Sequence, residues 1–265
     1  MAGKGEVLVF KLLLVLINLG IIALAAIEYQ IAKKRGLSLY TKLQAKISFQ
    51  LGVVHLIIGL TLMAYLYDLI KVSPQNKLFV LPDNLFWQVA FFFVIDFFAY
   101  WNHRLLHYFP LFWADHAVHH SCTEYNFLTH FQQGWTGFVS STLLFSFILN
   151  FVGNTAQVSF AYFIASVFSL TLTHTQLIGR LGVLELILVT PSHHRMHHAI
   201  ERETHDGNYG LIFIIWDKLF GTYKDEGEKQ ATQFGLKNTP KLTEPIWSHA
   251  FFSWKEYIQS HRLRR

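Results

Sequence analysis

Histidine is the residue type whose number and spacing stand out in this sequence. Fifteen histidines are present, and eight of them fall into three groups with helical spacing: His103 and His107; His116, His119 and His120; and His194, His197 and His198. Residues three and four positions apart share one face of a helix, so each group presents its imidazoles to one side. Imidazole is a common ligand of iron and zinc ions. Three such helices could together fill most of the coordination sites of two adjacent ions.

Other polar side chains are candidates to complete or support this centre. His174 follows the last predicted membrane span and lies at the same predicted depth as the three groups, so we interpret it as a ninth ligand. His193 directly precedes the third group, and metal binding and a supporting hydrogen bond are equally open for it. The carboxylates that we predict to hydrogen-bond the outer ring nitrogens are Asp96, Asp115 and Asp206.

The remaining histidines are isolated along the chain, and we expect no ligand role for them: His55, His130, His205, His249 and His261. An isolated histidine near a membrane interface is usually an ordinary polar residue. Cys122 lies beside the second group, and we interpret it as a small buried residue. Because it is the one cysteine in the sequence, an internal disulfide is excluded.

The composition indicates the surroundings in which these residues are held. Of the 265 residues, 52% are hydrophobic and 15% are charged, whereas a soluble domain usually has about a quarter charged residues. This is typical of a membrane protein and favours one compact unit, 1–265. We divide it into N-terminal membrane helices (1–83), a catalytic core with the histidine groups (84–224) and a cytosolic tail (225–265). The net charge of +5 comes from basic residues that flank apolar runs, which suits an anionic membrane leaflet rather than nucleic acid.

Five apolar runs are long enough to be membrane spans, given a rise of roughly 1.5 Å per helical residue. They cover residues 7–27, 48–70, 84–100, 134–152 and 156–173. Residues 181–189 are too short to span and are expected to lie at the interface or to re-enter the membrane. We therefore predict an all-α, integral-membrane helical bundle of about four or five transmembrane helices, with a cytosolic helical cap that holds the metal site.

Local signals place the histidine groups on helices. His103 continues directly from the third apolar run, and Pro110 marks both the end of that helix and the start of the next one, which carries the second group. Thr190 and Pro191 have the pattern of a capping residue followed by proline at the first helical position. A third helix is therefore predicted to begin just before the last group.

The distribution of Lys and Arg in the loops predicts the orientation. The loop 28–47 carries five basic residues, whereas the loop 71–83 carries two. The first loop is therefore expected in the cytosol, and alternation of the spans then places every histidine group and the C-terminus on the same side. The expected location is a bacterial inner membrane or the endoplasmic reticulum.

The three groups, in this order and after an apolar run, resemble those of the fatty acid hydroxylase and sterol desaturase superfamily of membrane di-iron enzymes. The similarity continues in Asn208-Tyr209-Gly210 and in Trp-Asp-Lys-Leu-Phe-Gly-Thr at 216–222, which resemble the family's closing motif. It covers roughly residues 103–222, and its motifs are specific as a set. The stretches 124–126 and 190–194 look most similar to the alkylglycerol monooxygenase branch.

This resemblance implies two iron ions (Fe2+/Fe3+), O2 as a co-substrate, a lipid substrate and an external electron donor. The donor would be a b-type cytochrome, a ferredoxin or a reduced pterin, so an electron-donor protein is an expected partner. The implied activity is hydroxylation or desaturation of a fatty acyl, sterol or ether lipid, with no catalytic residues beyond the metal ligands. The Asn-Tyr-Gly and Trp-Asp stretches are expected to form a turn and an aromatic anchor.

Other classes of histidine-rich or lipid-modifying protein fit less well. A metal transporter would need ligands near the middle of the membrane, and a structural zinc site would be closed by four ligands. Eight or nine histidines at one cytosolic rim suit neither class, and no nucleophile set indicates a lipid hydrolase. The alternative that stays open is a histidine-rich membrane protein that binds or transports metal without oxidase activity.

Overall fold

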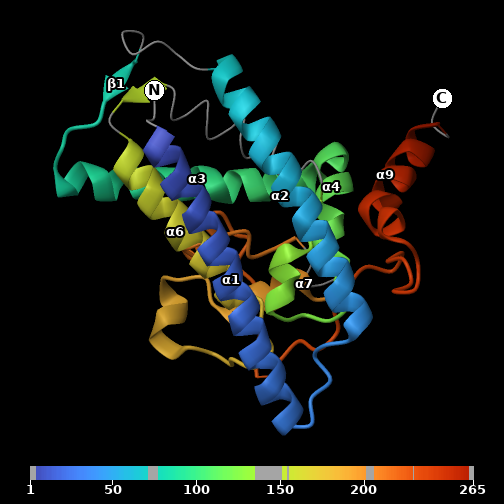
Figure 1. Cartoon of the computed structure of the whole chain (residues 1–265). Helices are drawn as coiled ribbons and strands as arrows, with labels where there is room; N and C mark the ends of the chain where they lie inside the picture. Colours follow the sequence, from blue (N-terminus) through green and yellow to red (C-terminus); the bar gives the residue numbers. More distant parts are fainter. Residues whose placement is uncertain are drawn as a thin grey trace.

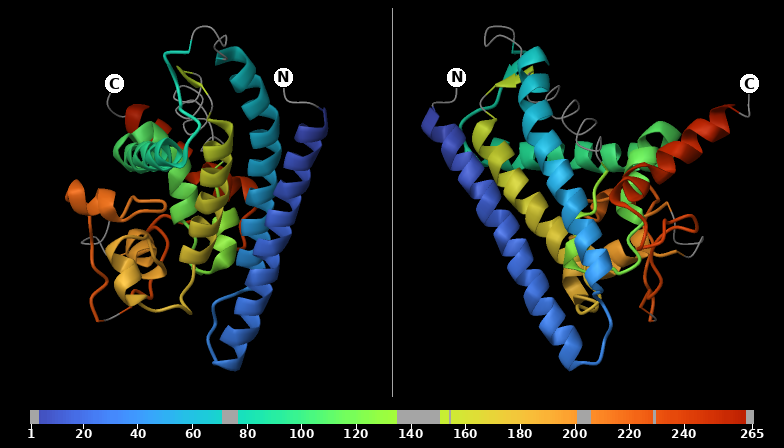
Figure 2. Two further views of the ribbon diagram at one scale, coloured as in Figure 1. Left: turned by 90° about the vertical axis from the view of Figure 1, so that its left-hand side faces the viewer. Right: turned by 45° about the vertical axis from the view of Figure 1, so that its right-hand side comes forward.

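Three long helices form one layer of this mostly helical protein. The computed structural model describes residues 4–70, 77–134, 151–153, 155–200, 206–228 and 230–262. Helices α1 (Lys4–Lys34), α2 (Lys42–Ile70) and α6 (Ala156–Thr173) run roughly along one direction, as Figures 1 and 2 show. All three contact the short 3-10 helix η2 (Phe127–Phe131), which follows the second histidine group in the sequence.

The first two histidine-bearing helices begin where the sequence provides a signal. Helix α3 (Leu85–Tyr108) follows Asn84, whose side chain accepts a hydrogen bond from the Trp87 N–H at 3.2 Å. It crosses the layer at a steep angle in Figure 1 and is seen nearly end-on in the left view of Figure 2. Helix α4 (Pro110–His120) then starts with a proline, which fits the first turn of a helix. The predicted helix boundary at Pro110 is confirmed.

The third histidine group lies on α7 (Pro191–His198), whose predicted start is also confirmed. Thr190 is its N-cap residue, and the proline that follows has no N–H to leave without a partner. Two further helices follow, α8 (Ile215–Leu219) and α9 (Ile246–Arg262). Helix α9 packs against α4 and α2, so the tail contributes to the packing around the histidine-bearing helices.

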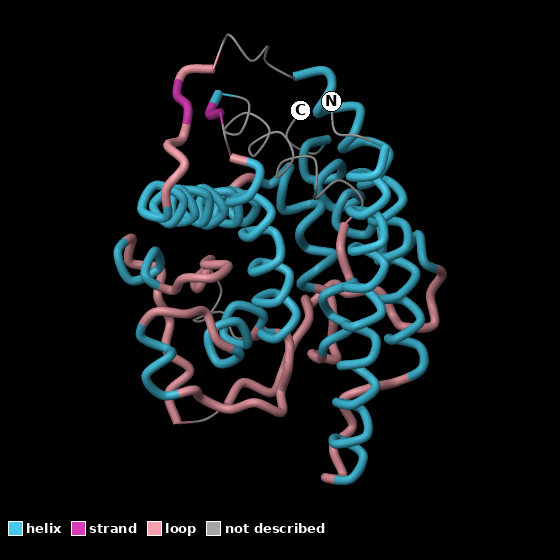
Figure 3. Tube along the Cα trace, turned by 60° about the vertical axis from the view of Figure 1, so that its left-hand side comes forward, coloured by secondary structure: helices cyan, strands magenta, loops and turns pink. Residues whose placement is uncertain are grey.

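Short non-α elements complete the described chain. The strands β1 (Phe79–Val80) and β2 (Val152–Gly153) pair in parallel, and Figure 3 shows them as small additions to the helices. The all-α prediction did not contain them, because two residues leave no periodic pattern in a sequence. The segment that was predicted too short to span contains the 3-10 helix η3 (Gly182–Leu186), in which Val183 and Leu186 are exposed.

Two of the described helices are long and apolar enough to cross a membrane: Val15–Lys34 within α1, and α3. The residues Gln157–Thr173 of α6 form a shorter apolar helix. These segments correspond to the first, third and fifth predicted runs, although α3 continues to Tyr108 because the His103 and His107 turn remains helical. The second run lies within α2, and residues 135–150 of the fourth run lie outside the described part of the chain. Four or five spans therefore stay a prediction.

A hydrophobic core between α3 and α6 positions the metal-binding end of both helices. Its buried members are Leu81, Phe91, Ile95, Ala99, Val158, Tyr162 and Ile212. These side chains fix the relative position of the two helices along the turns that precede His103 on α3 and His174 after α6. The core thus determines where the first and ninth predicted ligands lie.

Candidate metal centre

Nine buried or partly buried histidines gather in two adjacent groups, and they are the nine predicted ligands. We call these sets the five-histidine group, which contains His103, His107, His116, His120 and His197, and the four-histidine group, which contains His119, His174, His194 and His198. Within each group the ligand nitrogens all lie within 4.8 Å of one another. Among the described residues, no carboxylate or cysteine joins either group.

The spacing within each helix explains how the histidines are divided. On α4, His116 belongs to the five-histidine group together with His120, four positions later, whereas His119 belongs to the other group. On α7, His194 and His198 share a group in the same way, and His197 does not. Because a turn contains 3.6 residues, positions i+3 and i+4 fall on opposite sides of position i. The repeated His-x2-His-His motif therefore allows one helix to serve two adjacent ions.

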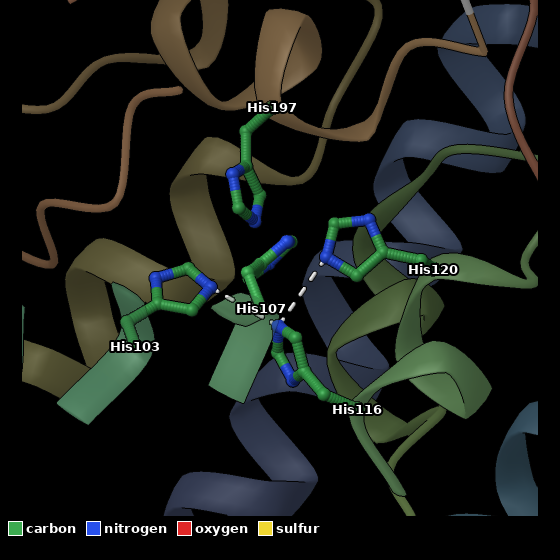
Figure 4. Close-up of side chains that lie close together, drawn as sticks. All are labelled: His103, His107, His116, His120 and His197. Carbon is green, nitrogen blue, oxygen red and sulfur yellow. Dashed lines mark hydrogen bonds between the residues drawn. The ribbon is translucent and has the colours of Figure 1, made fainter. Parts of the chain in front are cut away.

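In the five-histidine group, the inner ring nitrogens face one another around a common point (Figure 4). The His116 Nε2 lies 3.1 Å from the His103 Nε2 and 3.3 Å from the His120 Nε2. Two nitrogens that bind one ion at about 2.1 Å are separated by roughly 3.0 Å in octahedral and roughly 3.4 Å in tetrahedral geometry. These nitrogens are therefore spaced as ligands of one ion.

The four-histidine group has the same spacing, and a backbone carbonyl defines which ring nitrogen of His174 is protonated. The His174 Nε2 lies 3.2 Å from the His119 Nε2 and 3.1 Å from the His194 Nε2. The Nδ1 of His119 lies 3.0 Å from the Gln132 carbonyl oxygen, and the Nδ1 of His174 contacts the Leu170 carbonyl oxygen. A carbonyl oxygen only accepts, so the Nδ1 of His174 carries the proton and the Nε2 of this neutral imidazole carries a lone pair. The Nδ1 of His119 lies between the Gln132 carbonyl oxygen and the Gln133 Nε2, which is 3.2 Å away.

The positions of the inner ring nitrogens test whether these residues fit a metal ion. The His174 Nε2 lone pair points toward the Nε2 atoms of His119 and His194 in a buried site, an arrangement that suits a cation between these nitrogens. Within the described chain, the buried Nε2 of His198 in the same group has no hydrogen-bond partner. Both observations fit a bound cation, and an all-nitrogen ligand set suits iron, zinc, copper or nickel rather than magnesium or calcium.

Burial keeps these imidazoles neutral, which is the form that binds metal. It lowers the pKa of His119 to about 3. Burial, followed by repulsion between neighbouring imidazoles, also lowers the pKa well below the ordinary value of 6.5 for His116, His120, His174, His194 and His198. These six imidazoles therefore stay neutral near neutral pH.

Backbone carbonyls, rather than the three predicted carboxylates, contact the outer ring nitrogens of four of the nine histidines. Besides the two contacts above, the His103 Nδ1 donates to the Tyr209 oxygen at 2.9 Å and the His197 Nδ1 donates to the Gly207 oxygen at 2.8 Å. Of the predicted carboxylates, Asp206 is brought to the site, with its Oδ1 3.7 Å from the His107 Nδ1. Carbonyl acceptors carry no sequence signal, so the sequence could not reveal them.

Asp96 was predicted to support a ligand histidine, and that prediction is wrong. Its buried carboxylate accepts hydrogen bonds from the Tyr162 hydroxyl at 2.9 Å, the Trp216 Nε1 at 2.9 Å, and the backbone N–H groups of Ile212 and Phe213. Asp96 shares a face of α3 with His103 but lies two turns, or roughly 10 Å, before it. It therefore ties α3 to α6 and to the start of α8 instead.

The other two uncertain residues have different positions. His193 lies in neither histidine group; its Nδ1 accepts from the Thr190 N–H at 3.3 Å and so caps the start of α7. Asp115 lies against Gly134, where an added Cβ would be 2.3 Å from the carboxylate. Whether Asp115 orients a ligand stays a prediction.

The isolated histidines whose side chains the structure describes, His55, His130 and His249, join neither group. The side chain of His261 lies outside the described part. His205 lies outside the described residues.

Arg195 is a residue beside the centre that the sequence argument missed. It lies on α7 between His194 and His197, is fully buried, and forms a two-bond ion pair with Glu226. Its Nη1 also donates to the carbonyl oxygens of Thr175 at 3.0 Å and Ile178 at 2.6 Å. An arginine inside a histidine motif was a possible signal, because a charge at that position must either face solvent or be paired.

The geometry defines a helical protein with two adjacent, all-histidine sites for metal ions, at the end of helices that are apolar enough for a membrane. The model of the fatty acid hydroxylase family matches residues 88–222. The chain belongs to this family, as the order of its histidine motifs predicted.

Curated relatives extend the similarity beyond the family model. The chain is 36% identical to human alkylglycerol monooxygenase over 206 residues, which are 75% of this chain and 44% of the relative. It is 39% identical to the alkylglycerol monooxygenase of Danio rerio over 176 residues, 64% of this chain and 38% of the relative. The ornithine lipid hydroxylase OlsE of Rhizobium tropici is 30% identical over 160 residues, 58% of this chain and 48% of the relative. The chain thus spans less than half of each of these relatives, and no solved structure matches it.

Proposed function

We propose that this protein is a membrane-bound di-iron oxidoreductase that uses O2 to hydroxylate, or desaturate, a lipid. The observation that carries the proposal is the pair of histidine groups, in which neighbouring inner nitrogens lie 3.1 to 3.3 Å apart. The names of the relatives, which refer to alkylglycerols and to an ornithine lipid, make these two lipids the first substrates to test.

The protein's own residues would hold and protect the metal ions. The five-histidine group would hold one ion and the four-histidine group the other. When bound, the two ions would supply the reduction of O2 and the oxidation of an unactivated C–H bond. The carbonyl oxygens of Tyr209, Gly207 and Leu170 keep the outer nitrogens of His103, His197 and His174 protonated, so that their Nε2 lone pairs point inward. Burial of the histidines excludes water from the site.

The membrane arrangement is part of the same proposal. We propose four or five spans, with the histidine groups and the C-terminus in a cytosolic cap. The two membrane-capable helices and the family membership support a membrane location. Because the proposed reaction consumes electrons, a separate donor is needed: a b-type cytochrome, a ferredoxin or a reduced pterin.

Metal content and O2 consumption test the proposal. Protein purified in detergent after growth with iron should contain about two iron ions per chain, and a His119→Ala, His197→Ala double variant, which removes one ligand from each group, should lose them. A His193→Ala, His249→Ala double variant removes the same number of histidines outside the two groups and should keep the iron. The loaded protein should consume O2 when given a reductant together with an alkylglycerol or an ornithine lipid.

Two outcomes would count against the proposal. Wild-type protein without metal, or a His119→Ala, His197→Ala variant that retains both ions, would refute the two-ion site. Two bound ions without O2 consumption on either lipid would instead favour the alternative, a membrane metal-binding protein without oxidase activity.

A further inference from the structure

One short loop, residues 206–210, orients ligands from two different helices. Its Tyr209 carbonyl oxygen accepts a hydrogen bond from the His103 Nδ1 at 2.9 Å, and its Gly207 carbonyl oxygen accepts one from the His197 Nδ1 at 2.8 Å. His103 lies on α3 and His197 on α7, and both belong to the five-histidine group. The sequence predicted only a turn here, whereas the loop also orients two histidines of the five-histidine group.

In both peptide groups, Tyr209–Gly210 and Gly207–Asn208, the N–H opposite the carbonyl also forms a hydrogen bond. The C=O and N–H of one trans peptide point in opposite directions. The Tyr209 carbonyl shares its peptide with the Gly210 N–H, which donates to the Asp217 Oδ2 at 2.8 Å. The Gly207 carbonyl shares its peptide with the Asn208 N–H, which donates to the Thr222 carbonyl oxygen at 3.0 Å. Fixing the N–H end aims each carbonyl at an imidazole.

The carboxylate of Asp217 connects both of these anchors. This side chain lies on α8 and is fully buried. Besides the Gly210 N–H, it accepts from the Tyr209 N–H at 2.7 Å and from the Thr222 hydroxyl at 2.7 Å. Asp217 therefore binds the Tyr209–Gly210 peptide directly. It also binds Thr222, whose carbonyl oxygen anchors the Gly207–Asn208 peptide.

The backbone of the loop needs such anchors to keep its shape. Asp206 and Asn208 have φ values of 62° and 55°, in the left-handed region that residues other than glycine rarely adopt. The two glycines are also tightly enclosed, since an added Cβ would lie 2.7 Å from the Thr222 oxygen at Gly207 and 2.6 Å from the Phe213 oxygen at Gly210. The strained conformation persists because the surrounding contacts determine it.

We propose that Asp217 is a positioning residue for the ion of the five-histidine group, acting through the Tyr209–Gly210 peptide on His103. A charged acceptor at the N–H end polarises the peptide, which makes the carbonyl a stronger acceptor and the imidazole a stronger ligand. The inference rests on the proposed two-metal centre and adds that Asp217 affects one of its two ions. It also gives the Trp-Asp motif a role beyond packing.

An Asp217→Asn variant loaded with 57Fe tests this inference by Mössbauer spectroscopy and iron titration. The wild type should show two iron environments, one for each histidine group. In the variant, one environment should shift or disappear and its iron should bind on the order of 10- to 100-fold more weakly, the range for groups that orient a metal ligand. The other environment should be unchanged. Asp225→Asn, which removes a carboxylate that is 51% exposed, is the control and should resemble the wild type.

The remaining outcomes distinguish a positioning role from a structural one. An unchanged spectrum for Asp217→Asn, or equal loss of both ions together with a lower melting temperature of the metal-free protein, would overturn the inference. If Asp217→Asn does not fold, Thr222→Val, which removes one bond to the same carboxylate, should weaken the same single ion, and no effect there would overturn it. Wild-type protein without iron would refute the proposed function, and this inference with it.

Discussion

Replacing Glu226 with glutamine should destabilise the protein strongly, although the change removes only one charge. Glu226 accepts from the Arg195 Nε at 2.7 Å and from its Nη2 at 2.7 Å, and the two side chains are 0% and 3% exposed for Arg195 and Glu226, respectively. The variant leaves the arginine charge buried without a counter-charge. Arg195 also holds the carbonyl of Thr175, which follows the ligand His174, so the four-histidine group should be disturbed as well.

The expected magnitude follows from burial. Breaking a buried ion pair by removing one partner costs about 3–5 kcal/mol. For a protein of this size, about 1 kcal/mol corresponds to roughly 2–4 °C in melting temperature, so the shift should be on the order of 10 °C. Asp225→Asn is the matched control, because Asp225 pairs with Arg180 at 2.9 Å but the side chains are 51% and 46% exposed. Exposed pairs of this kind contribute about 0–1 kcal/mol.

Thermal unfolding of the metal-free proteins in detergent is the assay, followed by iron titration. Equal melting shifts for Glu226→Gln and Asp225→Asn would refute the reasoning. An Arg195→Met, Glu226→Met double variant should be more stable than Glu226→Gln, because no buried charge remains. It should not reach wild-type stability, since the carbonyls of Thr175 and Ile178 lose their donor.

Three further predictions concern the metal centre. His198→Ala should lower the iron content from about two ions to about one, because His198 belongs to the four-histidine group alone; loss of both ions would contradict separate sites. His193→Ala should keep both ions in the same measurement and lower the stability by about 1 kcal/mol, as expected for a lost helix cap. Chelation of the metal should lower the melting temperature, since an ion that binds only the folded state at a concentration 100 times its Kd stabilises it by about 2.7 kcal/mol; an unchanged value would show that the metal contributes little to folding.

The sequence predicted which histidines come together, because helical spacing and metal binding impose a pattern on residue types. The two His-x2-His-His motifs, together with Pro110 and Pro191, correctly predicted helices that bring imidazoles together. His174 has no motif, and its predicted membrane depth was enough to suggest it. Division of the ligands into five and four was not predicted, because it depends on how α3, α4 and α7 cross.

The support around the ligands was predicted less well, for a physical reason. Asp96 was a reasonable candidate because it shares a face of α3 with His103. It lies two helical turns from His103, however, and its carboxylate accepts from Tyr162 and Trp216 instead. The actual acceptors are mostly backbone carbonyls, which every residue possesses. Arg195 pairs with Glu226, which lies 31 positions later, and Asp217 accepts from the backbone N–H of Tyr209; only the folded chain shows these pairs.

The absence of carboxylates from the two histidine groups has a consequence for charge balance. In the described part of the chain, both groups contain neutral imidazoles, and the nearest acid noted above, Asp206, approaches a ring nitrogen of His107 at 3.7 Å. Two divalent ions would therefore bring four positive charges into a buried site with almost no compensating charge from the residues that the structure describes. Oxidising the ions would add more charge where solvation is weakest. Such a site favours the lower oxidation state, so its reduction potential should exceed that of a comparable centre bridged by carboxylates, and anions such as hydroxide should bind tightly to the ions.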